Sequence, residues 1–234
     1  MELGSDPGLS FNGPVPSLTF GDPAEWPPHD VVGLSTELTM PMVIEGYLAG
    51  VFPMPVEIDG RHEIAWFSPV DRGILPLDGL RVTRSLRKTM KRYTVSVDRA
   101  FDEVMARCAD PSRPGAWIDD EITAVYGALH RRGLAHSVEC WDAAGRLVGG
   151  LYGVSLGGLF AGESMFHDAE HGRDASKAAL VHLVSRLTAA GGERLLDVQW
   201  LTPHLETLGV VEVPREEYLE LLERVLPTPA PVWL

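Results

Sequence analysis

The sequence of 234 residues has little cysteine, no long hydrophobic run and a shortage of positive charge. The two cysteines, Cys108 and Cys140, lack the spacing of a metal site, so we expect buried, reduced thiols in a cytoplasmic protein. No run of about 18 apolar residues occurs, so no membrane-spanning helix is expected, and the first residues lack the basic and apolar blocks of a secretion signal. The formal net charge of −13 argues against a non-specific nucleic-acid binder, but it does not exclude a local basic patch.

Hydrophobic residues make up 45% of the chain, which suffices for one large core or two unequal ones. Residues 1–32 are rich in proline, glycine and aspartate, so we expect a mostly irregular tail. Residues 33–80 predict a small N-terminal domain, and residues 81–234 predict a second domain. The predicted helices are Met40–Ala49, Thr83–Arg92, one that Asp98 caps, Asp119–Arg132, one from Asp174 or Ser176 to Ala190, one between Thr202 and Gly209, and Arg215–Leu226.

The strand pattern indicates the fold class. The predicted strands are Ile64–Phe67, Gly73–Pro76, Tyr93–Val97, Ala135–Trp141, Leu147–Val154, Leu159–Ser164, Leu195–Trp200 and Val210–Val213, while Val51–Val56 is expected to turn the chain. The order predicts an α+β fold with a mixed, largely antiparallel sheet, in which a strand follows a long helix and extends a meander. That order is similar to the order in GCN5-related acyltransferases.

A glycine-rich hairpin runs from Gly149 to Phe166 and has six glycines in eighteen residues. Glycine weakens a strand, and its usual benefit is that another group can lie close to the backbone. Glu163 follows near the end of the second strand, where a buried carboxylate needs a cation or a hydrogen-bond donor. One interpretation is a tight bend whose acid reaches solvent, and the other is a pocket floor that presents a carboxylate to a positively charged ligand.

Two further polar residues lie on a neighbouring apolar strand. Asp197 and Gln199 are two residues apart, so their side chains face the same way. If the strand of Glu163 belongs to the same sheet, two carboxylates and an amide converge. The alternative is that Asp197 and Gln199 satisfy backbone groups of the adjacent loop.

Several other chemistries are disfavoured. The run from His167 to His171 lacks the spacing that places two imidazoles on one helical face, so we expect no metal site. Ser164 does not lie in a nucleophile elbow. The loop before Ser176 lacks the glycine-rich run with which acetyltransferases hold coenzyme A, which counts against an acyl-CoA donor.

A basic helix is the exception to the acidity of the chain. Arg84, Arg87, Lys88 and Lys91 fall at three- and four-residue spacings along one side. Such a stripe is often only a solvated face. In a chain of net charge −13 it also predicts a salt-sensitive contact with phosphates.

With these residues identified, the chain resembles the leucyl/phenylalanyl-tRNA–protein transferases from about Thr36 to Leu226. The resemblance implies transfer of Leu or Phe, less often Met, from aminoacyl-tRNA to an N-terminal Arg or Lys of a protein, which marks that protein for N-end-rule degradation. It also implies a GCN5-related N-acetyltransferase-like (FemX-like) C-terminal domain. The matching segments are Gly46–Met54, Trp66–Pro69, Thr83–Leu86, Ala116–Ile118, His136–Glu139, Gly149–Val154, Leu159–Phe166, Ala175–Lys177 and Leu196–Gln199.

The resemblance assigns roles to particular residues. Asp197 would bind and orient the attacking amine, and whether it also takes the proton of that amine is left open. Gln199 would hydrogen-bond the reacting groups, and Glu163 would meet the acceptor's basic side chain or amine. The basic helix would hold the tRNA. The aminoacyl-adenosine pocket would comprise Phe67, Trp117, Tyr126, Leu151 and Phe160, for each of which core packing is the alternative; Phe67 replaces a tryptophan of the family.

The reaction itself sets the expected requirements. The tRNA ester is already activated, so no ATP, coenzyme or metal is expected, and we expect a monomer. Two rival functions remain: an N-acyltransferase that uses acyl-CoA, and a non-catalytic module that binds basic N-terminal peptides.

Overall fold

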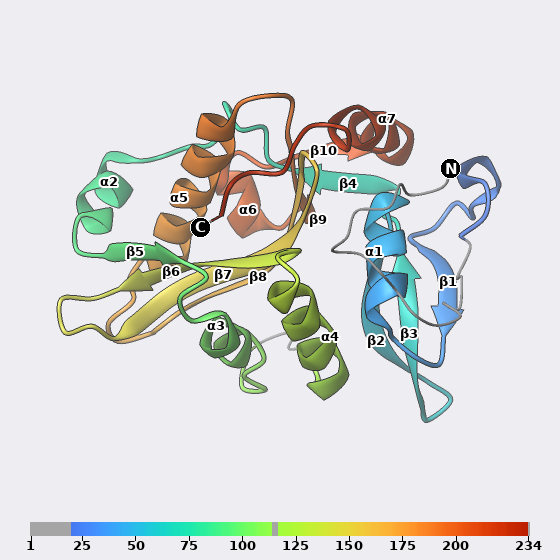
Figure 1. Cartoon of the computed structure of the whole chain (residues 1–234), viewed down its shortest axis with the longest axis horizontal. Helices are drawn as coiled ribbons and strands as arrows, with labels where there is room; N and C mark the ends of the chain where they lie inside the picture. Colours follow the sequence, from blue (N-terminus) through green and yellow to red (C-terminus); the bar gives the residue numbers. More distant parts are fainter. Residues whose placement is uncertain (1–19, 114–116, 234) are drawn as a thin grey trace.

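The computed structural model describes residues 20–113 and 117–233 (Figure 1). A three-stranded antiparallel sheet contains β1 (Val31–Ser35), β2 (Phe52–Ile58) and β3 (Arg61–Phe67) in the order β1-β3-β2. The helix α1 (Met40–Leu48) packs beside it, and the short helix η1 (Pro23–Glu25) precedes it. Tail residues 1–19 lie outside the described residues, as does Ala116 of the segment Ala116–Ile118.

The larger sheet has seven strands in the order β10-β4-β9-β8-β7-β6-β5. Only β8 and β9 of this described sheet pair in parallel; its other pairs are antiparallel. The expected α+β class and the mixed, largely antiparallel sheet are therefore confirmed. The strands are β4 (Asp71–Ile74), β5 (Thr94–Val97), β6 (Ala135–Trp141), β7 (Leu147–Leu156), β8 (Leu159–His167), β9 (Leu195–Gln199) and β10 (Val211–Pro214).

Helices cover both faces of this sheet (Figure 1). The long helix α5 (Ala175–Ala190) packs on β6, β7 and β8 from one side, and α3 (Phe101–Cys108) and α4 (Asp120–Arg131) pack from the other. Each face has its own cluster of buried apolar side chains. The remaining helices are α2 (Arg84–Met90), α6 (Pro203–Leu208) and α7 (Arg215–Val225).

Two of the predicted helix caps are confirmed. Thr83 and Asp119 cap α2 and α4 by accepting a hydrogen bond from a backbone amide three residues later. The predicted cap at Asp98 is wrong. Asp98 instead accepts from the Ser137 amide at 2.9 Å and pairs with His136 at 2.7 Å, and α3 begins three residues later.

In the N-terminal part, the predicted strand Ile64–Phe67 is confirmed within β3, but the other expectations about strands were wrong. The segment predicted as a turn is β2, which tolerates Pro53 and Pro55 because it is an edge strand, and proline is found in sheets at such edges. The short strand β1 falls partly within the expected tail. The predicted strand near Gly73 forms β4 of the large sheet rather than part of a small N-terminal layer. The division of the chain into domains stays a prediction.

No helix among the described residues is long and apolar enough to cross a membrane. Both cysteines are buried and free, as expected.

Candidate active site

The only parallel strand pair of the described sheet opens into a fork. β8 and β9 pair at Leu159 with Leu195, at Phe160 with Leu196 and at Ala161 with Asp197, and no pairing follows. Because the strands run in the same direction, the residues after Ala161 and after Asp197 line the two arms of one opening. Glu163 lies on one arm and Gln199 on the other. The two polar residues therefore share a site.

A cavity of about 130 Å³ lies in this fork. Its polar members include Glu163, Ser164 and Gln199, and the rest of its wall is mostly aliphatic. For comparison, an apolar cavity of about 150 Å³ accepts a benzene-sized guest. The cavity thus fits one apolar side chain whose polar end faces Glu163 and Gln199. Its apolar lining is Leu75, Leu151, Met165, Leu180, Leu183, Leu196, Val198, Leu205 and Val210.

A β-bulge places Glu163 in the fork. Tyr152 of β7 pairs with Ser164 and the next residue, Gly153, pairs with Gly162, so Glu163 is the extra residue on β8. A bulge changes the direction in which a side chain points, and such bulges are frequent beside active sites. The glycine-rich sequence permits the close packing here, since a Cβ on Gly153 would lie 2.2 Å from the Ala161 carbonyl oxygen.

Gln199 occupies a strained turn at the end of β9. Its φ is +62°, and the Trp200 amide donates to the Val198 carbonyl at 2.8 Å, which makes Gln199 the centre of a γ-turn. A γ-turn with positive φ at a residue other than glycine is costly and persists only when its surroundings hold it. Gly73 permits this turn because a Cβ there would lie 2.9 Å from the Trp200 backbone.

The neighbouring Trp200 is fixed from the N-terminal side. Its indole donates to the Asp30 carboxylate at 3.0 Å and packs edge-on against Phe52 and Phe67. The other oxygen of Asp30 accepts from the Val70 amide at 2.9 Å. The N-terminal sheet thereby stabilises the turn that aims Gln199.

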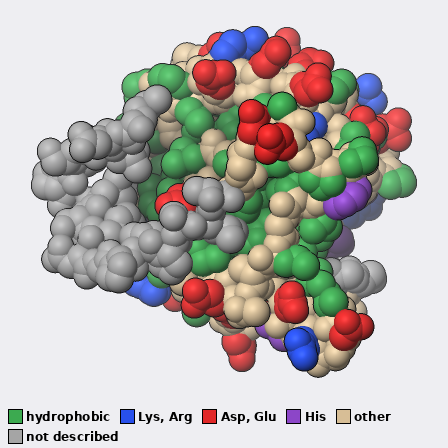
Figure 2. Space-filling view, turned by 90° about the vertical axis from the view of Figure 1, so that its right-hand side faces the viewer, with side chains coloured by type: hydrophobic (Ala, Val, Ile, Leu, Met, Phe, Trp, Pro, Cys, Tyr) green, Lys and Arg blue, Asp and Glu red, His purple; other side chains and the backbone are tan. Residues whose placement is uncertain are grey.

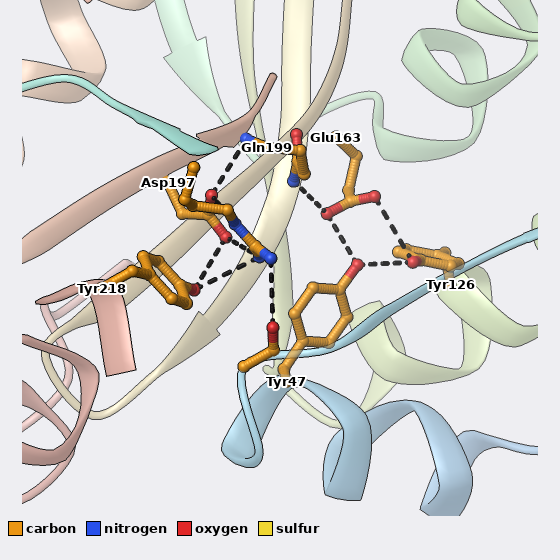
Figure 3. Close-up of polar contacts among 8 residues, drawn as sticks. Tyr47, Tyr126, Glu163, Asp197, Gln199 and Tyr218 are labelled. Carbon is orange, nitrogen blue, oxygen red and sulfur yellow. Dashed lines mark hydrogen bonds and ion pairs between the residues drawn. The ribbon is translucent and has the colours of Figure 1, made fainter. Parts of the chain in front are cut away.

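Glu163 is the acceptor of a small hydrogen-bond network (Figure 3). Tyr47 donates its hydroxyl to Oε1 at 2.6 Å, Gln199 donates Nε2 to the same oxygen at 3.2 Å, and Tyr126 donates to Oε2 at 3.4 Å. The two phenol oxygens lie 2.6 Å apart. These residues come from α1, α4, β8 and β9, so both parts of the chain build the site.

The environment of Glu163 brings the pKa of its carboxyl close to neutral pH. Burial raises the pKa of Glu163 to about 8, the nearby Asp197 adds to the rise, and the Tyr47 hydrogen bond and Arg72 oppose it. Burial, and then the charge of Glu163, raise the pKa of Tyr47 well above 10, so the phenol stays protonated as a donor. A carboxyl with a pKa near 8 can exchange a proton with an amine at neutral pH.

Asp197 is fully buried in an ion pair with Arg72. Arg72 donates Nε to Oδ1 at 2.9 Å and Nη2 to Oδ2 at 2.6 Å. Oδ1 also accepts from the backbone N–H of Gln199, and Oδ2 accepts from the Tyr218 hydroxyl at 3.0 Å. Burial by itself lowers the pKa of Arg72, but Asp197, Tyr218 and Tyr47 together outweigh it and the net change is upward.

Comparisons with known proteins identify the family. The sequence model described as "Leucyl/phenylalanyl-tRNA protein transferase" matches residues 74–223. A relative from Rhizorhabdus wittichii is 52% identical over 189 residues, 79% of this chain and 74% of the relative. A relative from Herpetosiphon aurantiacus is 48% identical over 196 residues, 82% of this chain and 97% of the relative. Both relatives are described as "Leucyl/phenylalanyl-tRNA--protein transferase".

The chain belongs to the leucyl/phenylalanyl-tRNA–protein transferase family. The expected family is thus confirmed, and the chain is an enzyme. Among solved structures, "The structure of L-PGS from Bacillus licheniformis" overlays with a TM-score of 0.37 at 13% identity, covering 70% of this chain and 57% of that chain. That likeness is too distant to assign the fold.

In this transferase, the residues expected to form one pocket lie in different places. Leu151 lines the cavity and Tyr126 bonds Glu163. Phe160 is fully buried and packs on Trp233, 5.4 Å between ring centroids. Phe67 contacts Phe52 and Trp200, and Trp117 lines a separate depression beside β2. Their binding roles stay predictions.

The basic stripe of the transferase lies on α2. All four of its side chains are exposed, so phosphates can reach them, as the predicted contact requires. These residues are Arg84, Arg87, Lys88 and Lys91. The described part of the chain holds no group of three or more His, Cys, Asp or Glu side chains placed to bind a metal ion.

Sequence reasoning missed three residues of the site. Tyr47 lies within the segment Gly46–Met54 that carries the resemblance, but nothing in that segment indicated that its hydroxyl would reach a residue 116 positions away. Arg72 and Tyr218 flank Asp197 from β4 and α7. The one available signal was Asp197 itself, since a carboxylate within a buried strand requires a cation.

Proposed function

We propose that this enzyme transfers Leu or Phe, and less often Met, from aminoacyl-tRNA to the N-terminal Arg or Lys of an acceptor protein. The observation that carries the proposal is the fork between β8 and β9, where an apolar cavity meets Glu163 and Gln199. The acceptor would thereby be marked for N-end-rule degradation. We also propose that the enzyme acts as a cytoplasmic monomer, and that residues 81–234 form a GCN5-related acyltransferase-like domain.

The donor's side chain would occupy the aliphatic cavity. Among the described residues, Glu163 alone brings a charge to its wall, which suits an uncharged, unbranched-at-Cβ side chain such as Leu, Phe or Met. The α-amino and ester groups would then lie at the mouth beside Glu163 and Gln199. In this position the ester carbonyl would lie next to an incoming acceptor amine.

We expect Val198→Phe to block donor binding, because Val198 lines the cavity and a ring there fills the space. Loss of one buried apolar side chain corresponds to about tenfold or more in KM. The measurement is the KM for leucyl-tRNA and for phenylalanyl-tRNA, with the larger donor more affected. Val211→Phe is the matched control, since Val211 is 42% exposed on β10; equal KM changes in the two variants would contradict the assignment of the cavity.

Glu163 would act as the base. The acceptor's α-ammonium has a pKa of about 8, close to the pKa of about 8 of Glu163, so transfer of a proton between them is nearly balanced. The Glu163 carboxylate takes one proton from the ammonium, and the amine nitrogen attacks the ester carbonyl. The bond to the ribose oxygen breaks, and that oxygen leaves with the second proton. Holding amine and ester together supplies about 7–11 kcal/mol in well-oriented cases.

Asp197 would act indirectly, by fixing the position of Gln199. Both of its oxygens are occupied by Arg72, Tyr218 and the Gln199 amide, and its side chain is fully buried. Direct contact with the acceptor's amine, as the resemblance suggested, is therefore disfavoured. Asp197 instead accepts a hydrogen bond from the backbone N–H of Gln199. The side chain of Gln199 in turn donates a hydrogen bond to Glu163.

The α2 stripe would hold the tRNA by its phosphates. We expect simultaneous Gln substitution of Arg84, Arg87, Lys88 and Lys91 to raise the tRNA KM and flatten its salt dependence, by about 0.7–0.9 in the slope of log K against log salt for each phosphate that is no longer neutralised. The measurement is KM for leucyl-tRNA from about 50 to about 200 mM salt, a range over which about six or more phosphate contacts change affinity by orders of magnitude. An unchanged slope would mean that the stripe does not touch RNA.

The direct test combines the purified enzyme with labelled leucyl-tRNA and a peptide that begins with Arg. We expect the peptide to gain one leucine, whereas a peptide that begins with Asp should gain none. Acyl-CoA with the same peptide distinguishes the acyl-CoA acyltransferase, and peptide binding without any transfer would indicate the non-catalytic module.

A further inference from the structure

The segments that form α2, β5 and α5 contain no Asp or Glu. The chain has 33 acidic residues, yet none lies in residues 79–97, which carry six Lys or Arg, or in residues 175–192. The first segment forms α2 and β5, and the second forms α5. These elements are therefore free of carboxylates, as are residues 122–138 and 143–162, and residues 79–97 carry the most Lys and Arg of these segments.

The two segments form one surface. α2 packs against α5, and β5 is the edge strand of the large sheet on the same side of the molecule (Figure 1). A groove of about 630 Å³ lies between β5, the last turns of α5 and the C-terminal residues 228–232. Arg186, Arg194 and His182 line it, and its described lining contains no acidic residue.

The two arginines are positioned but not neutralised. Arg186 donates Nη1 to the Val232 carbonyl at 2.6 Å, and Arg194 donates Nε to the Gly191 carbonyl at 2.7 Å. These partners are neutral, so both side chains are fixed while their charges remain uncompensated. In the part of the chain that the structure describes, Nη1 of Arg194 is buried without a partner, and burial lowers the pKa of this guanidinium.

The opposite end of the molecule is acidic. Figure 2 shows more Asp and Glu than Lys and Arg on the face that carries the N-terminal sheet and α7. α7 alone contributes Glu216, Glu217, Glu220 and Glu223. A polyanion approaching the enzyme is therefore directed to the side of α2 and α5.

We propose that the backbone of the donor RNA continues from the α2 stripe across α5 into this groove, where Arg186, Arg194 and His182 face its phosphates. The inference rests on the proposed function and extends its RNA site. α5 also supplies Leu180 and Leu183 to the donor cavity from its sheet-facing side. RNA on the outer side of α5 thus lies within about one helix diameter, roughly 10–12 Å, of the aminoacyl site.

The test adds charge to the groove without removing any interaction. Ala189 is exposed and lines the groove on α5. We expect Ala189→Glu to raise the KM for leucyl-tRNA about fivefold and Ala189→Lys to lower it by a similar factor, the scale of one surface charge pair. Ala124→Glu, at an exposed position of α4 on the other face of the sheet, is the matched control and should leave the KM unchanged.

A donor without phosphates separates the possible outcomes. Phenylalanyl-adenosine should react equally well with the wild type and with both Ala189 variants, and thermal unfolding confirms that each variant is folded. Unchanged tRNA KM values in both Ala189 variants, or equal effects on the adenosine donor, would overturn the extended RNA site while leaving the proposed function intact. No transfer by the wild type from either donor would instead refute the proposed function.

Discussion

Glu163→Gln should lower kcat for transfer by about 10²–10⁴-fold, the usual contribution of a positioned acid or base. The glutamine keeps the size of the side chain and accepts from Tyr47 at one oxygen, but it cannot take a proton. The measurement is single-turnover transfer at saturating leucyl-tRNA and Arg-peptide. A variant that retains half of the wild-type rate would exclude Glu163 as the base.

The pH profile of the same variant gives an independent readout. In the wild type, kcat/KM for the acceptor should rise with pH as Glu163 ionises, through its pKa of about 8. It should level off at higher pH, because an acceptor whose ammonium has already lost its proton is the free amine that attacks. In Glu163→Gln only the free amine reacts, so the lower rate should follow the pKa of the acceptor ammonium alone. Tyr47→Phe removes a donor to the carboxylate and should move the rising limb to higher pH.

Stability provides the control for folding. Because the folded-state pKa of Glu163 lies above its unfolded value, the protonated carboxyl is the form that folding favours. Wild-type stability from this group is therefore present below about pH 4.5 and is lost as pH rises to about 8. Glu163→Gln has no such charge, so it should be at least as stable as the wild type above about pH 8.

Asp197→Ala should destabilise the fold by about 3–5 kcal/mol, because it leaves the Arg72 guanidinium buried without a counterion. That is a large part of the roughly 5–15 kcal/mol that typically holds a domain folded. The measurement is urea unfolding at about pH 7 together with transfer activity. A decrease of less than about 1 kcal/mol in the free energy of unfolding would mean that the unpaired Arg72 guanidinium relaxes toward solvent.

The double variant Arg72→Met, Asp197→Leu separates stability from positioning. Replacing both charges with apolar groups of similar volume should restore most of the stability. Activity should remain low, because the Gln199 amide no longer has the Asp197 oxygen that fixes its strained turn. Recovery of transfer along with stability would show that the ion pair serves the fold alone.

The sequence predicted most of the helices and strands of the large sheet because its signals are local. Thr83 and Asp119 cap their helices with their own side chains, and the Gly-rich turn of the β7–β8 hairpin lies between its two strands. The strand β2 was missed because its prolines are acceptable only at a sheet edge, and whether a strand lies at an edge is a property of the whole sheet.

The candidate site was only partly predictable for a related reason. The same-face relation of Asp197 and Gln199 follows from strand geometry, and their proximity to Glu163 follows from a shared sheet. The bulge that directs Glu163, the γ-turn at Gln199 and the hydrogen bonds from Tyr47 and Arg72 depend on tertiary packing. The pairing of Asp197 with Arg72 turned an expected amine-binding carboxylate into a buried one.

The most direct measurement is the inhibition pattern of the product, a peptide that begins with Leu-Arg. If one fork holds both substrates, the product's leucine side chain fills the cavity of the donor while its peptide occupies the place of the acceptor. Such a product should compete with phenylalanyl-adenosine and also with the Arg-peptide, and Val198→Phe should weaken its inhibition. Competition with only one of the two substrates would mean that donor and acceptor bind at separate places, which contradicts the account.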